Sequence, residues 1–177
     1  MNKFNPVFIL VKPQMAENVG AVARAMLNFG FLNLRLVNPR ENHLSDRALS
    51  MAAGAGRVLD QAQVFENLAD ACKDLNEVLA TSDSDRYKYK DVVDTIDGCD
   101  TIFQNCARGY KVGILFGGQR AGLSNEDLFL AKRLIRIPSN PIFSSLNLAQ
   151  SVLLICYQLN SCSIGKNANI SQAEISD

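Results

Sequence analysis

The chain has 177 residues, 47% of them hydrophobic, which is enough for one domain with a core of its own. Eighteen Lys and Arg residues match eighteen Asp and Glu residues, so the formal net charge is zero and no global field attracts nucleic acid or anionic lipid. No stretch reaches the roughly 18 apolar residues of a membrane span, and the N-terminal segment lacks an export pattern, so neither membrane insertion nor export is predicted.

Metal ligands and catalytic histidines are scarce in this sequence. The five cysteines are an odd number and form no CxxC pair, so reduced thiols in a cytoplasmic protein are the simplest interpretation. His43 is the only histidine, and it stands in a polar stretch beside Asn42. We therefore expect His43 to be a solvated loop residue, and we predict neither a metal site nor a histidine-based catalytic triad.

The first elements along the chain alternate between strand and helix. Residues 7–11 are an uninterrupted apolar run of strand length, and residues 18–29 carry apolar side chains at helical spacing. Gly30 is a stop signal for this helix. Residues 32–37 then form a second strand, which ends before Asn38-Pro39. The chain therefore begins with the order strand, helix, strand.

The same alternation continues through the rest of the chain. Helical spacing and short apolar runs predict helices at residues 45–53 and 68–75, strands at residues 78–80, 114–116 and 134–137, and a long final helix. Strands that alternate with helices indicate an α/β fold with a mostly parallel sheet and helices on both faces. We expect one domain over residues 1–160 and a polar, disordered tail over residues 161–177.

A glycine-bearing loop follows the predicted strand at residues 114–116. Gly117, Gly118 and Gly122 allow the backbone to turn tightly and to approach a ligand closely. Ser124 is a good N-cap for the next helix, with Asp127 in its first turn. The loop does not match GxxxxGK[ST], and the first strand–helix junction lacks three spaced glycines. Neither an NTPase nor a Rossmann dehydrogenase is therefore favoured.

Polar residues gather where the predicted strands end. The candidates are Asn18 and Arg24 after the first strand, Thr81 and Ser82 after the third, residues 117–120 after the next, and residues 144–147 after the last. Open α/β sheets bind ligands at this edge, so a ligand site is predicted there. Arg24 stands among small and apolar residues and has two interpretations: its head pairs with a nearby carboxylate, or it contacts an anion or a phosphate.

Three segments stand in this order along the chain: residues 18–24 (NVGAVAR), residues 115–124 and residues 137–149. They resemble the three motifs of the SpoU (TrmH-like) family of RNA 2′-O-ribose methyltransferases, in the SPOUT class, of which the first is NxGxxxR. Shorter segments at residues 36–40, 52–55 and 80–82 resemble the branch that methylates cytidine or uridine in the tRNA anticodon loop. The resemblance spans roughly residues 4–159.

This resemblance implies a fold that general rules would not propose, because threading of a chain through its own loop is very rare. The C-terminal segment would form a trefoil knot, and S-adenosylmethionine would lie bent in the knotted loops. Glycine allows close backbone approach, apolar side chains can wall a purine, and hydroxyls can satisfy polar edges. The implied cofactor-binding residues are Thr81, Ser82, Asp83, Gly117, Ile137, Ser144, Ser145 and Leu146. For Ile137 and Leu146, core packing of the side chains is the alternative.

The resemblance also implies four catalytic residues, namely Arg24, Asn18, Ser145 and Asn147. A guanidinium with a pKa above ~12 is a poor base at neutral pH, so we expect Arg24 to grip the adjacent phosphate and to stabilise charge on the 2′-oxygen. Asn18 would orient Arg24 or the loop. Ser145 and Asn147 would line the reactive end of the site, at which the methyl group is transferred. This chain has Gln119 where the family commonly has glutamate, and a neutral acceptor forms a weaker hydrogen bond.

A tRNA substrate and a second copy of the chain are the implied partners. Residues 86–90 interleave three cations with two tyrosines, which suits phosphate contact and base stacking, although a solvated loop is the alternative. Dimers of the family use their first and last helices. The apolar run at residues 152–156 is long enough to serve both the core and such an interface.

Several functions remain open from the sequence. The first is a cytoplasmic, homodimeric tRNA 2′-O-ribose methyltransferase that uses S-adenosylmethionine. The second is a catalytically weak RNA-binding or cofactor-binding module of the same fold, which Gln119 and the short C-terminal part would fit. An rRNA 2′-O-methyltransferase and a generic α/β protein with another small ligand are the remaining alternatives. The intact residues Asn18, Arg24, Ser145 and Asn147 favour the first.

Overall fold

The computed structural model describes residues 4–83, 89–118 and 122–175, with side chains described up to residue 165. Its strands are β1 (Val7–Val11), β2 (Leu34–Val37), β3 (Gln63–Phe65), β4 (Glu77–Thr81), β5 (Asp91–Asp94), β6 (Val112–Gly117) and β7 (Arg133–Arg136). They form one sheet in the order β3-β2-β1-β6-β4-β7-β5, and every pair of neighbouring strands is parallel. The predicted α/β fold with a parallel sheet is therefore confirmed.

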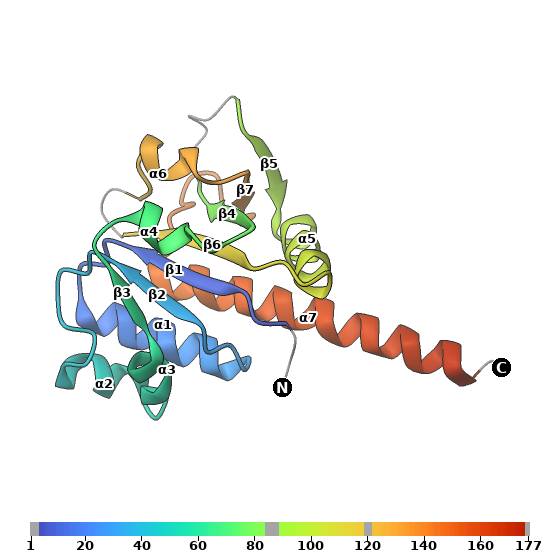
Figure 1. The fold of residues 1–177 in the computed structure, drawn as a ribbon, viewed down its shortest axis with the longest axis horizontal. Coiled ribbons are helices and arrows are strands. Elements are labelled where there is room, and N and C mark those ends of the chain that lie inside the picture. Colours follow the sequence, from blue (N-terminus) through green and yellow to red (C-terminus); the bar gives the residue numbers. More distant parts are fainter. Residues whose placement is uncertain (1–3, 84–88, 119–121, 176–177) are drawn as a thin grey trace.

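Helices cover both faces of this sheet, as the sequence predicts (Figure 1). They are α1 (Ala16–Asn28), α2 (Asp46–Ala52), α3 (Gly56–Gln61), α4 (Leu68–Cys72), α5 (Thr95–Ala107), α6 (Asn125–Phe129) and α7 (Leu148–Ile175). The larger core lies beneath the sheet, where α1, α5 and α7 bury their apolar sides. The smaller core lies between the opposite face and α4 and α6. The central strands β1 and β6 are buried on both faces, which explains their continuous apolar sequences.

The sequence analysis missed four short or weakly apolar elements: α3, α5, β3 and β5. Helix α5 buries Gly98, Cys99, Ile102 and Cys106, so two cysteines act as small apolar residues in place of the usual aliphatic ones. A Cβ atom at Gly98 would lie 2.8 Å from a side-chain carbon of Ile135, which explains a glycine within this helix. Strand β5 is mostly exposed at the edge of the sheet and therefore has no apolar run.

The last helix is longer than the sequence indicates. Helix α7 runs beneath the sheet and continues far beyond it, to Ile175 (Figure 1). It thus includes residues 161–175, for which the composition predicts a polar, disordered tail. The division into a domain of residues 1–160 and a separate tail stays a prediction, as does the trefoil knot. Over the described part of the chain, none of the helices combines the length and the apolar character that a bilayer crossing requires.

The glycine of the first motif has a packing role. Helix α1 packs against α2, and a Cβ atom at Gly20 would lie 2.1 Å from the backbone oxygen of Ala48. Gly20→Ala is expected to force the two helices apart and to lower the free energy of unfolding by about 3 kcal/mol. Urea unfolding measures this change. Ala21→Gly in the same helix is the control, with an expected loss of about 1 kcal/mol. Equal losses in the two variants would contradict the packing role.

A buried arginine anchors α4 and the turn after it to β2. The Arg35 guanidinium donates hydrogen bonds to both carboxylate oxygens of Asp74, at 2.6 and 2.9 Å, and to the backbone oxygen of Ala71, at 2.6 Å. The hydrogen bonds from Arg35 to the carboxylate, together with the positive charge of Arg35, lower the pKa of Asp74 to about 2. Because an unfolded aspartate has a pKa of about 3.9, the stabilisation is complete above this value and is lost as the pH falls towards 2.

Asp74→Asn is therefore expected to destabilise the protein in a pH-dependent way. The carboxylate is half exposed, so solvent screening limits the expected loss to about 1 kcal/mol at pH 7. The difference from the wild-type protein should shrink as the pH falls from about 4 to about 2, where the wild-type carboxylate also becomes neutral. Urea midpoints at several pH values measure this change. A difference that stays constant over this range would contradict the ion-pair explanation.

Candidate active site

The carboxyl ends of three neighbouring strands bring the predicted cofactor residues to one edge of the sheet. In the parallel register, Ala80 of β4 pairs with Leu115 of β6, and Thr81 pairs with Ile135 of β7. Strand β4 ends at Thr81 and β6 ends at Gly117, and Ile137 directly follows the last residue of β7. The segments that carry Thr81, Gly117 and Ile137 are therefore adjacent, although they are far apart in the sequence.

Thr81 and Ser82 tie this edge together. The hydroxyl of half-buried Thr81 donates a hydrogen bond to the backbone oxygen of Leu115, at 3.1 Å. The backbone nitrogen of Ser82 donates to the backbone oxygen of Ile135, also at 3.1 Å. The Thr81 hydroxyl thus holds β4 to β6, and it can still accept a hydrogen bond through its oxygen. Asp83 follows with an exposed side chain.

The glycine loop folds back on the end of β6. The backbone nitrogen of Gly122 donates to the backbone oxygen of Gly118, at 3.0 Å, and Gly122 has a φ angle of +60°. A Cβ atom at Gly117 would lie 2.5 Å from the backbone carbon of Gly122, and one at Gly118 would lie 2.7 Å from the backbone oxygen of Lys12. The predicted tight turn is confirmed for these glycines. Gln119 and Arg120 lie outside the described residues.

The loop between β7 and α7 carries four more of the predicted cofactor-binding residues. Ser144 and Leu146 are half-buried, and Ser145 is exposed. The Ser139 hydroxyl donates to the backbone oxygen of Ser144, at 3.2 Å, which draws the two ends of this loop together. Ile137, at the start of the loop, is also half-buried and packs at the margin of the larger core. Each of these residues keeps part of its surface accessible and can therefore contact a ligand.

Asn147 caps the last helix. Its side-chain oxygen accepts a hydrogen bond from the backbone nitrogen of Gln150, at 2.8 Å, and the Gln150 side chain accepts one from the backbone nitrogen of Asn147, at 3.1 Å. The sequence analysis assigned Asn147 to the reactive end and missed this structural use. An asparagine followed three residues later by glutamine, just before an apolar run, was the available signal.

Arg24 is exposed on α1, while its neighbours Val22, Ala23, Ala25 and Met26 are buried. Among the residues that the structure describes, no carboxylate pairs with its guanidinium, and no hydrogen bond joins it to the loop between β7 and α7. The first interpretation of Arg24, an internal ion pair, is therefore not supported there. An exposed guanidinium is available to an anion such as a phosphate.

The first turn of α1 begins earlier than predicted and has an unforeseen cap. The helix starts at Ala16, so Asn18 lies in its first turn and is half-buried. Met15 provides no side-chain cap, but the backbone nitrogen of Ala16 donates to the carboxylate of Glu41, at 3.4 Å. Arg47 bridges Glu41 and Glu17. This network ties the loop before α2 to the first motif, and its members are too far apart in sequence for any local pattern to reveal it.

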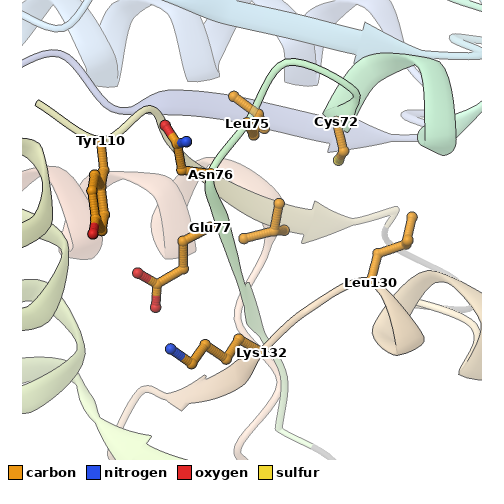
Figure 2. A pocket seen from close by; sticks show the side chains of 8 residues that line it. Cys72, Leu75, Asn76, Glu77, Tyr110, Leu130 and Lys132 are labelled. Carbon is orange, nitrogen blue, oxygen red and sulfur yellow. The ribbon is translucent and has the colours of Figure 1, made fainter.

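A cavity of about 290 Å³ lies where β4 begins, at the opposite end of this strand from Thr81 (Figure 2). Its lining residues are Cys72, Leu75, Asn76, Glu77, Val78, Tyr110, Leu130 and Lys132. Glu77 and Val78 open β4, whereas Thr81 closes it, so the cavity lies away from the predicted site. The buried carboxylate of Glu77 accepts a hydrogen bond from Asn105, which already satisfies one of its oxygens. The cavity is therefore not part of the predicted cofactor site at Thr81, Gly117 and Ile137.

The similarity to known proteins extends beyond the three motifs to most of the chain. The model of the SpoU rRNA Methylase family matches residues 5–157. A relative in Pseudomonas aeruginosa, named tRNA (cytidine/uridine/adenosine-2′-O-)-methyltransferase TrmJ, is 36% identical over 151 residues, which are 85% of this chain and 58% of that protein. The crystal structure of TrmJ from Z. mobilis ZM4 matches with a TM-score of 0.83 and 46% identity, and covers 89% of this chain and 69% of that one.

A more distant protein shares the fold alone. AviRb from Streptomyces viridochromogenes, a SpoU methyltransferase solved in complex with the cofactor AdoMet, has a TM-score of 0.73 at 19% identity, over 93% of this chain and 63% of its own. The chain spans between 58% and 68% of the length of the curated relatives it matches. Since the family model extends over most of the chain, the chain belongs to the SpoU methylase family.

Proposed function

We propose that the protein transfers a methyl group from S-adenosylmethionine to a ribose 2′-hydroxyl of tRNA, in the anticodon loop. The observation that carries this proposal is the family match over residues 5–157, together with relatives of 34–36% identity that are named tRNA 2′-O-methyltransferases. The geometry of the strand ends supports it, because the second and third motifs continue from strands β6 and β7, which lie on either side of β4 and Thr81. A cytoplasmic location follows from a tRNA substrate.

The strand-end residues fit the cofactor. Space at Gly117 and Gly118 is too narrow for a side chain, so only backbone groups face the loop there, as close approach to a ligand requires. Half-buried Ile137 and Leu146 can wall the adenine, and Thr81, Ser82, Ser144 and Ser145 can meet its polar edges and the ribose. Asp83 is exposed and can accept a hydrogen bond from a cofactor hydroxyl. We also expect the trefoil knot of the SPOUT class to shape this site.

The protein's own residues would position the ribose and stabilise its charge. When bound, the cofactor would supply an electrophilic methyl group, which would pass from its sulfonium sulfur to the 2′-oxygen while the hydroxyl proton is lost to solvent. Arg24 would hold the adjacent phosphate and stabilise the negative charge on the 2′-oxygen. Asn18 would orient the first motif. Ser145 would line the reactive end beside the amide nitrogen of Asn147, whose oxygen serves the helix cap.

We further propose that the protein is a homodimer. Helix α7 exposes Leu153, Leu154, Tyr157 and Ile164, and an apolar surface of this kind favours association. Light scattering after size exclusion should give the mass of two chains, and Leu154→Lys should give one chain, since a charge on this surface opposes burial. A wild-type protein that elutes as a single chain would contradict the dimer.

Methyl transfer from tritiated S-adenosylmethionine to unmodified tRNA and, separately, to unmodified rRNA tests the proposed substrate. We expect label in tRNA, and its loss in Arg24→Ala. Label in rRNA alone would favour the rRNA methyltransferase. Binding of the cofactor without transfer to either RNA would favour the weak module, in which Gln119 replaces the family's glutamate. The basic segment at residues 86–90 would contact the RNA; of it, the structure describes Tyr89 and Lys90.

A further inference from the structure

The loop between β7 and α7 displays two large apolar side chains in solvent. Ile142 is 94% exposed and Phe143 is 79% exposed. They stand immediately before Ser144 and Ser145, which belong to the proposed site. Neither side chain belongs to the two core clusters, so both are available to a binding partner.

Local hydrogen bonds hold this pair in place. The backbone nitrogen of Phe143 donates to the backbone oxygen of Asn140, at 3.0 Å, which closes a β-turn with Pro141 and Ile142 at its centre. The Asn140 side chain accepts a second hydrogen bond from the backbone nitrogen of Ile142, at 3.1 Å. Proline at the second position presets the backbone angle of the turn. The apolar tip is thus presented by an ordered turn, which lowers the entropic cost of binding.

The charge pattern indicates which part of an RNA this tip can contact. Residues 137–165 contain no Lys, Arg, Asp or Glu, so the loop has no cation for a phosphate. An exposed aromatic ring instead offers a surface on which a nucleobase can stack. Enzymes that recognise single-stranded RNA loops commonly use such rings for splayed bases.

Distance along the chain supports the same partner. Consecutive Cα atoms are 3.8 Å apart, so the Cα atoms of Phe143 and Ser145 are at most about 7.6 Å apart. A ribose whose 2′-hydroxyl lies at Ser145 carries its base on the neighbouring carbon atom. The base of that nucleotide therefore lies within reach of the Phe143 ring.

We propose that Phe143, supported by Ile142, stacks against the nucleobase of the nucleotide whose ribose is methylated. This inference rests on the proposed function and adds a substrate-positioning residue to it. Stacking tolerates every base, because each base has a π-face. Phe143 thus holds the target nucleotide without selecting its base. The ribose 2′-hydroxyl of that nucleotide then lies at Ser145.

A pair of RNAs tests this contact: the mapped tRNA substrate and the same RNA with an abasic target nucleotide. Phe143→Ala should lower kcat/KM on the normal RNA by about tenfold to a hundredfold, and Phe143→Tyr should retain it, because tyrosine stacks as well. On the abasic RNA, Phe143→Ala and the wild type should be equal. The control is Tyr110→Ala, which removes a ring of 49% exposure just before the first residue of β6, away from the carboxyl ends of the strands.

Three results would overturn the inference. The first is the same loss on both RNAs, or no loss on either. The second is a weaker affinity of Phe143→Ala for S-adenosylmethionine, which would make the ring part of the cofactor pocket. The third is a change from dimer to monomer, which would assign the tip to a subunit interface. A wild-type protein that methylates no RNA would instead refute the proposed function itself.

Discussion

Replacing Arg24 with lysine is expected to lower kcat by about two to three orders of magnitude. A lysine keeps the positive charge but cannot hold a phosphate and the 2′-oxygen with one planar, forked group. Arg24 is exposed and pairs with no carboxylate among the described residues, so the fold should not depend on it. Single-turnover kinetics with saturating cofactor and tRNA measure this effect.

The matched control is Arg57→Lys, which changes an exposed arginine on α3 that the proposed site does not include. Its rate should equal that of the wild type, and both variants should unfold at the wild-type urea concentration. A rate for Arg24→Lys close to the wild-type rate would show that a point charge suffices. The forked contact with phosphate and ribose would then be wrong.

Gly117→Ala is expected to weaken binding of S-adenosylmethionine by about tenfold to a hundredfold. The new Cβ atom would lie 2.5 Å from the backbone carbon of Gly122 and 2.6 Å from the backbone nitrogen of Leu123, so the loop would have to move. Both contacts are with backbone, which cannot give way as a flexible side chain can. Isothermal titration calorimetry with the cofactor measures the change.

Gly165→Ala serves as the control for this substitution. No atom lies within 4 Å of a Cβ at Gly165, which is exposed on α7. Cofactor affinity should therefore stay at the wild-type value in this variant, and helix stability should rise by about 1 kcal/mol. Unchanged affinity in Gly117→Ala would mean that the loop after β6 does not take part in cofactor binding.

The sheet was predictable because its inner strands are buried on both faces. Residues 7–11 and 114–116 read as continuous apolar runs, and both lie at the centre of the sheet. The capping box of Ser124 and Asp127 at the start of α6 also follows the local pattern. Helix α5 could not be recognised, because Gly98 and two cysteines form its buried side and their roles depend on packing against β7 and α7.

The site was predictable as a set of strand ends, and its internal contacts were not. Parallel strands bring Thr81, Gly117 and Ile137 to one edge, which motif order and sheet topology both indicate. The bridge of Arg47 to two carboxylates joins segments that only the fold brings together. The exposure of Phe143 was likewise not predictable, since the sequence alone does not show whether an apolar residue in a loop is buried or exposed.

The position of the transferred methyl group is the most direct test of the proposed reaction. After reaction with S-adenosylmethionine and unmodified tRNA, the RNA is digested to nucleosides and analysed by mass spectrometry, and alkaline hydrolysis is run in parallel. We expect a 2′-O-methylated nucleoside from the anticodon loop and a phosphodiester bond that resists alkali at that position. A methyl group on a base, or tRNA that stays unmethylated despite cofactor binding, would contradict the proposed reaction.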